Sequence, residues 1–165
     1  MKLIAPSGVS VVLPDNVHSE LFTLSKKSFP LETGGIIYGS YTDNNRCASI
    51  AGITAQTSDS RAGRTWFHRG VNRLQKFLNN LWSTKLYYLG EWHFHPSGAP
   101  HPSGRDLSSL KSIAASSKTN CSDPLMLIIG GTTSALTFRL FLVNADGDYV
   151  ELSSTEQQGT SFTSS

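Results

Sequence analysis

The sequence predicts a single α/β domain built around a mixed sheet. Its 165 residues suit one domain and are enough to bury a real core. Three helix-like segments are interspersed among many strand-like runs, which is typical of an α/β domain. The order is not the strict βαβ alternation of a dinucleotide-binding fold, and the chain has no GxGxxG or Walker loop.

The first elements are a hairpin and a helix. Residues 2–5 and 9–13 are β-rich runs around a Pro-Ser-Gly turn. Asp15 is placed to cap a helix that Phe29-Pro30 would end. The apolar face of this helix would consist of Val17, Leu21 and Leu24.

The middle of the chain predicts two strands, a loop and a second helix. The strands are residues 34–41 and 46–56, joined by turn residues 42–45. Residues 57–64 are polar and contain glycine, so we expect a mobile surface loop there. From Val71 apolar residues recur at intervals of three and four, namely Val71, Leu74, Phe77, Leu78, Leu81 and Trp82.

The remaining elements complete the sheet. Three largely buried strands are expected, at residues 86–94, 124–131 and 135–144. A helix should run from about residue 103 to 116, and an Asp-Gly turn leads into a last strand at 149–152. We therefore place the domain at residues 1–152. Residues 153–165 form a Ser/Thr-rich tail with too little apolar surface to fold, which we expect to be disordered.

Composition excludes several classes of function. The formal net charge is +2, from 14 basic and 12 acidic residues, and no basic cluster exceeds Lys26-Lys27, so no nucleic-acid partner is expected. The two cysteines, Cys47 and Cys121, form neither a disulfide framework nor a CxxC site. Because the N-terminus does not read as a signal peptide and no apolar run reaches about 18 residues, we expect a cytoplasmic protein without a membrane partner.

The most informative stretch is GEWHFHPSGAPHPSGRD. His93 and His95 are two apart at the end of a strand, so both imidazoles face the same side. Asp106 lies in the first turn of the expected following helix, which would direct its carboxylate toward the two rings. Two imidazoles and a carboxylate form a common catalytic zinc set with one open position.

Simpler interpretations of the same residues stay open. A His-x-His pair can serve packing and hydrogen bonding alone. Ser103 and Asp106 also fit a capping box, which does not exclude ligation by Asp106. His101 is a rival third ligand in the loop between two prolines. The two remaining histidines, His18 and His68, fit surface or core positions better.

Hydrolysis also needs a proton carrier, and a carboxylate with a raised pKa can serve. The candidates near apolar segments are Glu20, Glu32, Glu91 and Glu151. Glu91 shares a strand face with His93 and could orient that histidine. Glu32 lies between a helix exit and a strand, beside a double glycine that permits close backbone approach. An exposed loop carboxylate remains the alternative for Glu32.

Taken together, these residues resemble the JAMM (JAB/MPN) metalloprotease signature. The matching pattern is Glu32 in E-T-G-G, then His-x-His-Pro, six residues and Ser-x-x-Asp, and the resemblance extends to about Val150. It implies a curved mixed sheet flanked by helices, with one Zn²⁺ bound by His93, His95 and Asp106. Glu32 would be the catalytic acid/base, and Ser103 would donate a hydrogen bond to the oxyanion.

The resemblance also implies a function. JAMM enzymes cleave the bond after the C-terminus of ubiquitin or a ubiquitin-like protein. The segments ETGGIIYG, TWFHRG and GEWHFHP are similar to stand-alone bacterial members of antiphage CBASS operons. The substrate would be a cGAS/DncV-like nucleotidyltransferase (CD-NTase) that an E1–E2-like fusion enzyme has joined through its extended C-terminal tail to a target protein.

Three alternatives remain at this point: a peptidase that trims a sulfur-carrier-type ubiquitin-like protein or its adducts, a non-catalytic module that binds a ubiquitin-like tail, and a DNA-repair-associated relative. The last is disfavoured because no helix-hairpin-helix or basic patch accompanies the motif. Trp66, Phe67 and Trp92 are candidates to line the substrate groove, although core packing fits at least two of them. Residues 57–64 could act as a substrate flap.

Overall fold

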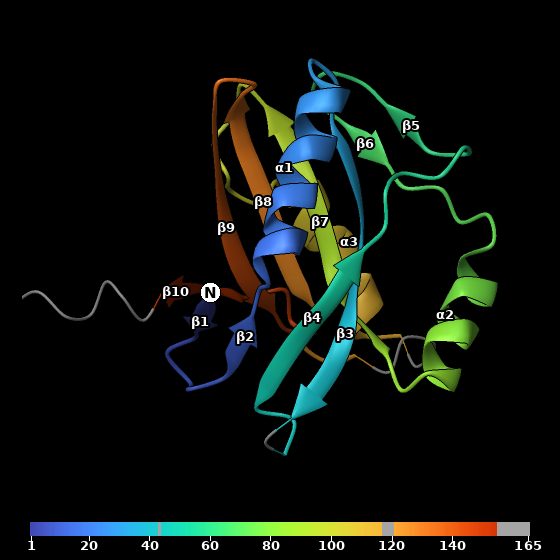
Figure 1. Cartoon of the computed structure of the whole chain (residues 1–165), viewed down its shortest axis with the longest axis vertical. Helices are drawn as coiled ribbons and strands as arrows, with labels where there is room; N and C mark the ends of the chain where they lie inside the picture. Colours follow the sequence, from blue (N-terminus) through green and yellow to red (C-terminus); the bar gives the residue numbers. More distant parts are fainter. Residues whose placement is uncertain (43, 117–120, 155–165) are drawn as a thin grey trace, which may run out of the picture.

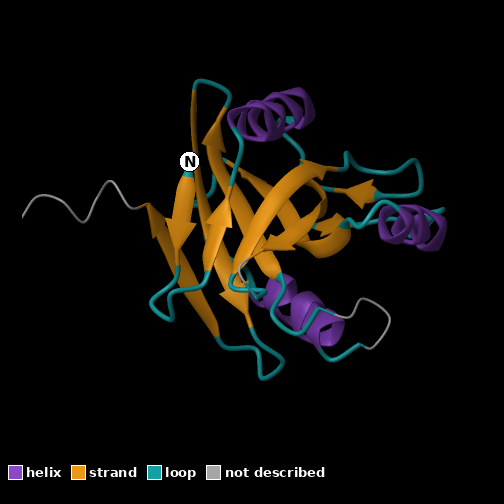
Figure 2. Cartoon of the chain, turned by 60° about the horizontal axis from the view of Figure 1, so that its bottom comes forward, coloured by secondary structure: helices purple, strands orange, loops and turns teal. Residues whose placement is uncertain are grey.

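The computed structural model describes residues 1–42, 44–116 and 121–154. Eight strands form one sheet that closes on itself, in the order β1-β10-β9-β8-β7-β3-β4-β2. The three helices lie around the outside of this sheet (Figure 1, Figure 2). Within the described ranges, no helix is long and apolar enough to cross a membrane.

The sheet is mixed, as predicted. The pairs β2–β4 and β7–β8 are parallel and all other neighbours are antiparallel. Its strands are β1 Lys2–Ile4, β2 Ser10–Val12, β3 Thr33–Thr42, β4 Cys47–Ile53, β7 Tyr87–Pro96, β8 Leu125–Thr132, β9 Ala135–Val143 and β10 Tyr149–Ser154. The helices are α1 Asp15–Ser28, α2 Leu74–Ser83 and α3 Gly104–Ala114.

Strand β8 shows why the apolar run at its centre is continuous. Leu125, Leu127 and Ile129 point into the main core, against which α1 also packs. Met126 and Ile128 point the other way, into a second cluster with Leu110 of α3. In Figure 1, α1 accordingly crosses one side of β8 and α3 lies on the other. A strand covered on both faces has no polar face, so the alternation of a half-exposed strand is absent.

An irregularity in β7 aims the histidines. Ile37 pairs with Gly90 but Tyr38 pairs with Tyr88, so β7 carries one extra residue there. Beyond this bulge Trp92 and Phe94 belong to the main core. The alternate residues of the strand, including both histidines, therefore face away from that core.

Two helix boundaries differ from the prediction. Asp15 is not the cap of α1: Pro14 occupies the N-cap position without a side-chain hydrogen bond, and Asp15 is the first helical residue. There its negative charge favours the helix N-terminus. Helix α2 begins at Leu74, so Val71 lies before it and is 69% exposed.

Residues 57–64 lie at the surface, as predicted, but part of the segment is a strand. Arg61–Ala62 (β5) pairs antiparallel with Phe67–His68 (β6) in a small separate sheet. Asp59 fastens the segment before β5, because its carboxylate accepts hydrogen bonds from the backbone N–H groups of Val71 and Asn72 at 2.9 Å.

Two free thiols, Cys47 and Cys121, agree with the absence of a disulfide framework.

The last strand passes the predicted domain boundary at residue 152. Ser153 and Ser154 belong to β10 and pair with Ile4 and Leu3 of β1. Their place in the ladder depends on backbone hydrogen bonds, which the polarity of their side chains did not predict. The rest of the predicted tail, residues 155–165, lies outside the described residues.

Candidate metal centre

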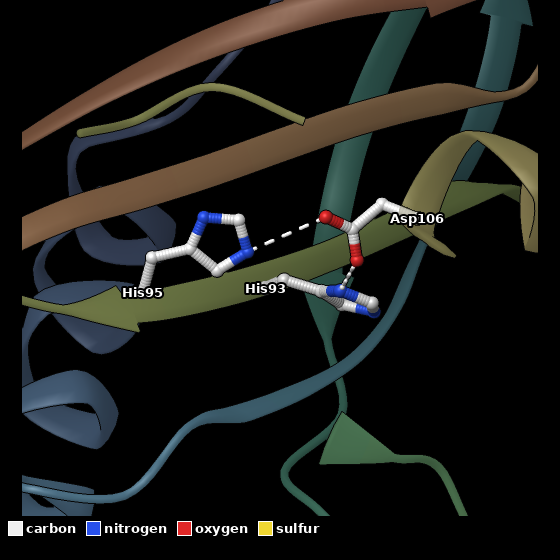
Figure 3. Close-up of side chains that lie close together, drawn as sticks. All are labelled: His93, His95 and Asp106. Atoms are coloured by element: carbon white, nitrogen blue, oxygen red, sulfur yellow. Dashed lines mark hydrogen bonds and ion pairs between the residues drawn. The ribbon is translucent and has the colours of Figure 1, made fainter. Parts of the chain in front are cut away.

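The three predicted ligands converge (Figure 3). Nδ1 of His93 lies 2.6 Å from Oδ1 of Asp106, and Nε2 of His95 lies 3.4 Å from Oδ2 of the same carboxylate. One ligand atom from each of the three residues lies within 4.8 Å of the other two. Three side chains with the chemistry of a metal site thus share one spot at the end of β7.

The sequence folds this way for local reasons. His93 and His95 are two apart on a strand, so they share a face. After Pro96 the chain turns back, and Ser103 caps α3: Asp106 N–H donates to Ser103 Oγ at 3.2 Å, and Ser103 N–H donates to Asp106 Oδ2 at 2.7 Å. The capping box is therefore real, and the same carboxylate also faces both imidazoles.

The charge of His93 and the charge of Asp106 each depend strongly on the other. Burial lowers the pKa of His93, but hydrogen bonds to Asp106 and Glu91 outweigh burial and raise this pKa to about 9. Burial raises the pKa of Asp106, but hydrogen bonds from His93 and His95 hold it well below its ordinary value. Without a metal, His93 is therefore charged at neutral pH and its proton balances the carboxylates.

The donor set fits a divalent transition metal. Two imidazole nitrogens and one carboxylate oxygen are ligands that Zn²⁺ accepts in catalytic sites, with a further position open. All three residues are at least partly buried, so their side chains are held in place before any ion arrives. The residues present can hold a metal ion.

Glu32 lies at the edge of this cluster. It immediately precedes Thr33, which pairs with Phe94, so continuation of the register brings Glu32 beside His95. Glu32 is half-buried, and this burial raises the pKa of its carboxyl, on which the charges of His95 and Asp106 also act. Glu32 thus lies in the loop before β3, but its carboxyl is only partly exposed.

The rival ligand His101 lies apart from the cluster. Its Nε2 contacts Nη1 of Arg139 at 3.0 Å, and its ring packs against Phe141 at a centroid distance of 6.2 Å. His101 thus fastens the loop between His95 and Ser103 to β9.

The three aromatic groove candidates separate by burial. Trp66 is 39% exposed, whereas Trp92 is fully buried in the core and its Nε1 donates to the carbonyl of Thr54 at 3.0 Å. Trp92 is therefore a core residue, in keeping with the core packing that fitted at least two of the three candidates. Phe67 is buried and meets the ring of His93 edge-on, with 5.6 Å between centroids.

One residue that supports the site, Arg69, could not be predicted from the sequence. Arg69 donates to the buried carboxylate of Glu91, which itself lies beside His93. Glu91 could be predicted because it shares a strand face with His93. A single arginine after a short aromatic run carries no comparable signal, because its partner is 22 residues away.

A mixed sheet that presents His-x-His-Pro at a strand end, faced by a helix-opening aspartate and an upstream glutamate, defines a metal-dependent hydrolase of the JAMM type. The chain belongs to the family described as prokaryotic homologs of the JAB domain, whose model matches residues 14–142. The predicted family, fold class and enzyme class are confirmed.

Curated relatives carry corresponding names. A protein of Enterobacter hormaechei subsp. hoffmannii described as a CD-NTase/cGAS isopeptidase is 45% identical over 122 residues, 74% of this chain and 68% of that protein. An Escherichia coli protein of the same description is 32% identical over 105 residues, 61% of this chain and 62% of the relative. A probable metalloprotease of Sinorhizobium fredii is 24% identical over 126 residues, covering 72% and 74%.

Solved structures agree on the fold. The solution structure of a protein from Desulfitobacterium hafniense superposes with a TM-score of 0.62 at 18% identity, covering 86% of this chain and 88% of that one. At this identity the match shows the fold alone.

Proposed function

We propose that this protein is a cytoplasmic, zinc-dependent isopeptidase that releases a CD-NTase from proteins to which its C-terminus has been joined. The observation that carries the proposal is the convergence of His93, His95 and Asp106 beside Glu32. The relative at 45% identity, described as a CD-NTase/cGAS isopeptidase, supports the choice of substrate. The conjugate would be the product of an E1–E2-like fusion enzyme in antiphage defence.

In this proposal His93, His95 and Asp106 hold one Zn²⁺. When bound, the ion would supply Lewis acidity toward the scissile carbonyl and toward the attacking water. Asp106 is suited to this role because hydrogen bonds keep its carboxylate ionised. The two imidazoles are held on the same face of β7, so both would be available to one ion.

Glu32 carries the proton. Burial raises its carboxyl pKa, which brings the group closer to the range in which a side chain both accepts and returns a proton. It takes a proton from the attacking water and delivers it to the departing lysine amine. The backbone N–H of Glu32 donates to the carbonyl of Gly63 at 2.8 Å, which fixes the start of β3 at this point.

Ser103 stabilises the oxyanion. Its Oγ accepts a hydrogen bond from Asp106 N–H, so the hydroxyl hydrogen remains available for donation. Ser103 is also exposed to solvent and thus accessible to a substrate. A donor aimed at the developing charge contributes to the rate without moving during the reaction.

The substrate tail would lie extended beside the metal cluster, where pairing with a strand edge gives affinity through backbone hydrogen bonds. Exposed Trp66, above Gly63 in the β5–β6 segment, is the aromatic residue that we place on this path.

The test is cleavage of a purified CD-NTase–target conjugate followed by intact-mass spectrometry. We expect two products from the wild type, none after chelation, and recovery when zinc is restored. Binding without cleavage by the metal-loaded protein would make the chain a recognition module. Cleavage only of a sulfur-carrier-type adduct would assign the other substrate class.

A further inference from the structure

His93 is held between two carboxylates, of which only one belongs to the proposed ligand set. Its Nδ1 faces Asp106 at 2.6 Å, and its Nε2 faces Oε2 of Glu91 at 3.6 Å. Glu91 is 2% exposed, so its carboxylate is desolvated in the folded protein. The reaction described above assigns no role to this buried group.

Arg69 fixes the carboxylate of Glu91. Its Nε and Nη2 each lie 2.9 Å from Oε1 of Glu91. Both contacts fall on one oxygen, which leaves Oε2 directed at His93. A planar guanidinium that donates twice restricts both the position and the rotation of its partner.

We propose that Glu91, held by Arg69, is a positioning residue that orients His93 for the metal ion. The inference rests on the proposed function, because it requires an ion at the His93, His95 and Asp106 cluster. An imidazole that ligates a metal through one nitrogen donates its other N–H to a fixed acceptor, which sets the tautomer and the ring angle. The carboxylate of Glu91, 3.6 Å from Nε2, favours the tautomer with its proton on that nitrogen, so the lone pair of Nδ1 is directed toward Asp106 and the open centre of the cluster.

The segment that carries Arg69 also contacts the site at two other points. Phe67, two residues earlier, packs edge-on against the His93 ring at an interplanar angle of 81°. The carbonyl of Gly63 accepts the backbone N–H of Glu32. Residues 63–69 therefore contact the His93 ring through Phe67 and hold Glu91 beside it through Arg69. The same segment fixes the backbone of the proposed base. Within this segment, Ser60 and Asp59 accept hydrogen bonds from the backbone N–H groups of residues 70–72, which hold its two ends together.

The test measures zinc affinity by competition with a chromogenic chelator, well below the unfolding temperature of each variant. Glu91→Gln keeps the shape but weakens the acceptor, and we expect zinc to bind about 10- to 100-fold more weakly. If Arg69 acts through Glu91, the double variant Arg69→Met/Glu91→Gln binds zinc as weakly as Glu91→Gln alone. Matched controls are Glu20→Gln on α1 and Arg73→Met before α2, which should keep wild-type affinity.

Folding is controlled separately. Arg69→Met leaves a buried carboxylate without its cation and is expected to be destabilised. The double variant removes both charges, so it should fold, and circular dichroism checks this. The absorption spectrum of bound Co²⁺ should also change in Glu91→Gln, because the spectrum reports the ligand field and not the stability of the fold.

The experiment distinguishes a failure of the Glu91 proposal from a failure of the proposed metal site. Wild-type zinc affinity together with an unchanged Co²⁺ spectrum in Glu91→Gln and in the double variant overturns the role of Glu91 and leaves the proposed function intact. If the wild type binds no zinc, or His93→Ala binds it as tightly as the wild type, the proposed metal site itself fails.

Discussion

Gly34 lies directly opposite His93 in the β3–β7 pair, and there is no room for a side chain between them. A Cβ at Gly34 would overlap the carbonyl oxygen of Trp92 and would lie 2.7 Å from Cδ2 of His93 and 3.0 Å from Cε1 of Phe67. The ring of a proposed ligand thus rests on the bare backbone of the neighbouring strand. The second glycine of the motif is equally confined, since a Cβ at Gly35 would overlap the carbonyl oxygen of Thr54.

Gly34→Ala should therefore displace the His93 ring. We expect zinc affinity to fall at least about tenfold, as when the support of a ligand is lost, with about 1–3 kcal/mol of destabilisation from overpacking. Gly104→Ala is the matched control, because a Cβ there meets no atom within 4 Å although the residue lies between Ser103 and Asp106. Chelator competition and denaturant unfolding measure both effects. Unchanged zinc affinity in Gly34→Ala would contradict this account.

Glu32→Gln should abolish turnover and spare the metal. Gln keeps the size of the side chain but cannot take up a proton at neutral pH, so we expect a loss of about 10²- to 10⁴-fold in kcat. Zinc content, measured by elemental analysis, should equal that of the wild type. Glu20→Gln, an exposed carboxyl on α1, serves as the control for charge. Retained turnover in Glu32→Gln removes Glu32 from the mechanism.

Ser103 combines a structural and a catalytic role, and two substitutions compare them. Ser103→Ala loses the N-cap acceptor and the hydroxyl donor, so we expect about 1 kcal/mol less stability and about 10²-fold lower kcat. Ser103→Thr keeps both functions and should remain close to wild type. A Ser103→Ala variant that loses stability but keeps its kcat shows that Ser103 only caps α3.

The parts of the site that depend on local geometry could be predicted from the sequence. The i, i+2 spacing of His93 and His95 fixes a common strand face, and the capping spacing fixes where Asp106 points. The double glycine after Glu32 signalled the close approach that Gly34 makes to His93.

Features that depend on distant partners could not be predicted. The apolar character of Trp92 is compatible with a groove or a core, and only the pairing of β7 between β3 and β8 buries it. The polar composition of residues 57–64 indicated a surface loop, but it did not indicate that residues 61–62 pair with 67–68 or that Asp59 binds the backbone before α2. Arg69 contacts Glu91, which is 22 residues away in the sequence, and no spacing rule predicts such a pair.

His101→Ala should leave metal binding unchanged. His101 contacts Arg139 and Phe141 on β9, outside the ligand cluster. We expect wild-type zinc affinity and at most about 1 kcal/mol of lost stability from the missing hydrogen bond. His95→Ala, two positions from His93, should lose zinc in the same chelator competition. Equal losses in the two variants would make His101 a ligand and contradict the placement of the loop.

The charged state of His93 predicts how the metal-free protein responds to pH. Hydrogen bonds to Asp106 and Glu91 outweigh burial and raise the His93 pKa from 6.5 to about 9. Because the folded pKa is the higher one, the charged ring stabilises the fold fully below the unfolded pKa, and this contribution disappears as pH rises through about 9. Denaturant unfolding of chelated protein should therefore show a loss of stability between these two values, which His93→Gln should lack.

The same proton must leave when a metal ion binds, since Nδ1 cannot carry a proton and ligate at once. Zinc loading near neutral pH should release a proton per chain from His93, and calorimetry in buffers of different ionisation enthalpy measures that release. In His93→Gln the proton release from this ring is absent. Zinc binding without proton release, together with chelated stability that does not change through about pH 9, would mean that His93 is already neutral in the metal-free protein.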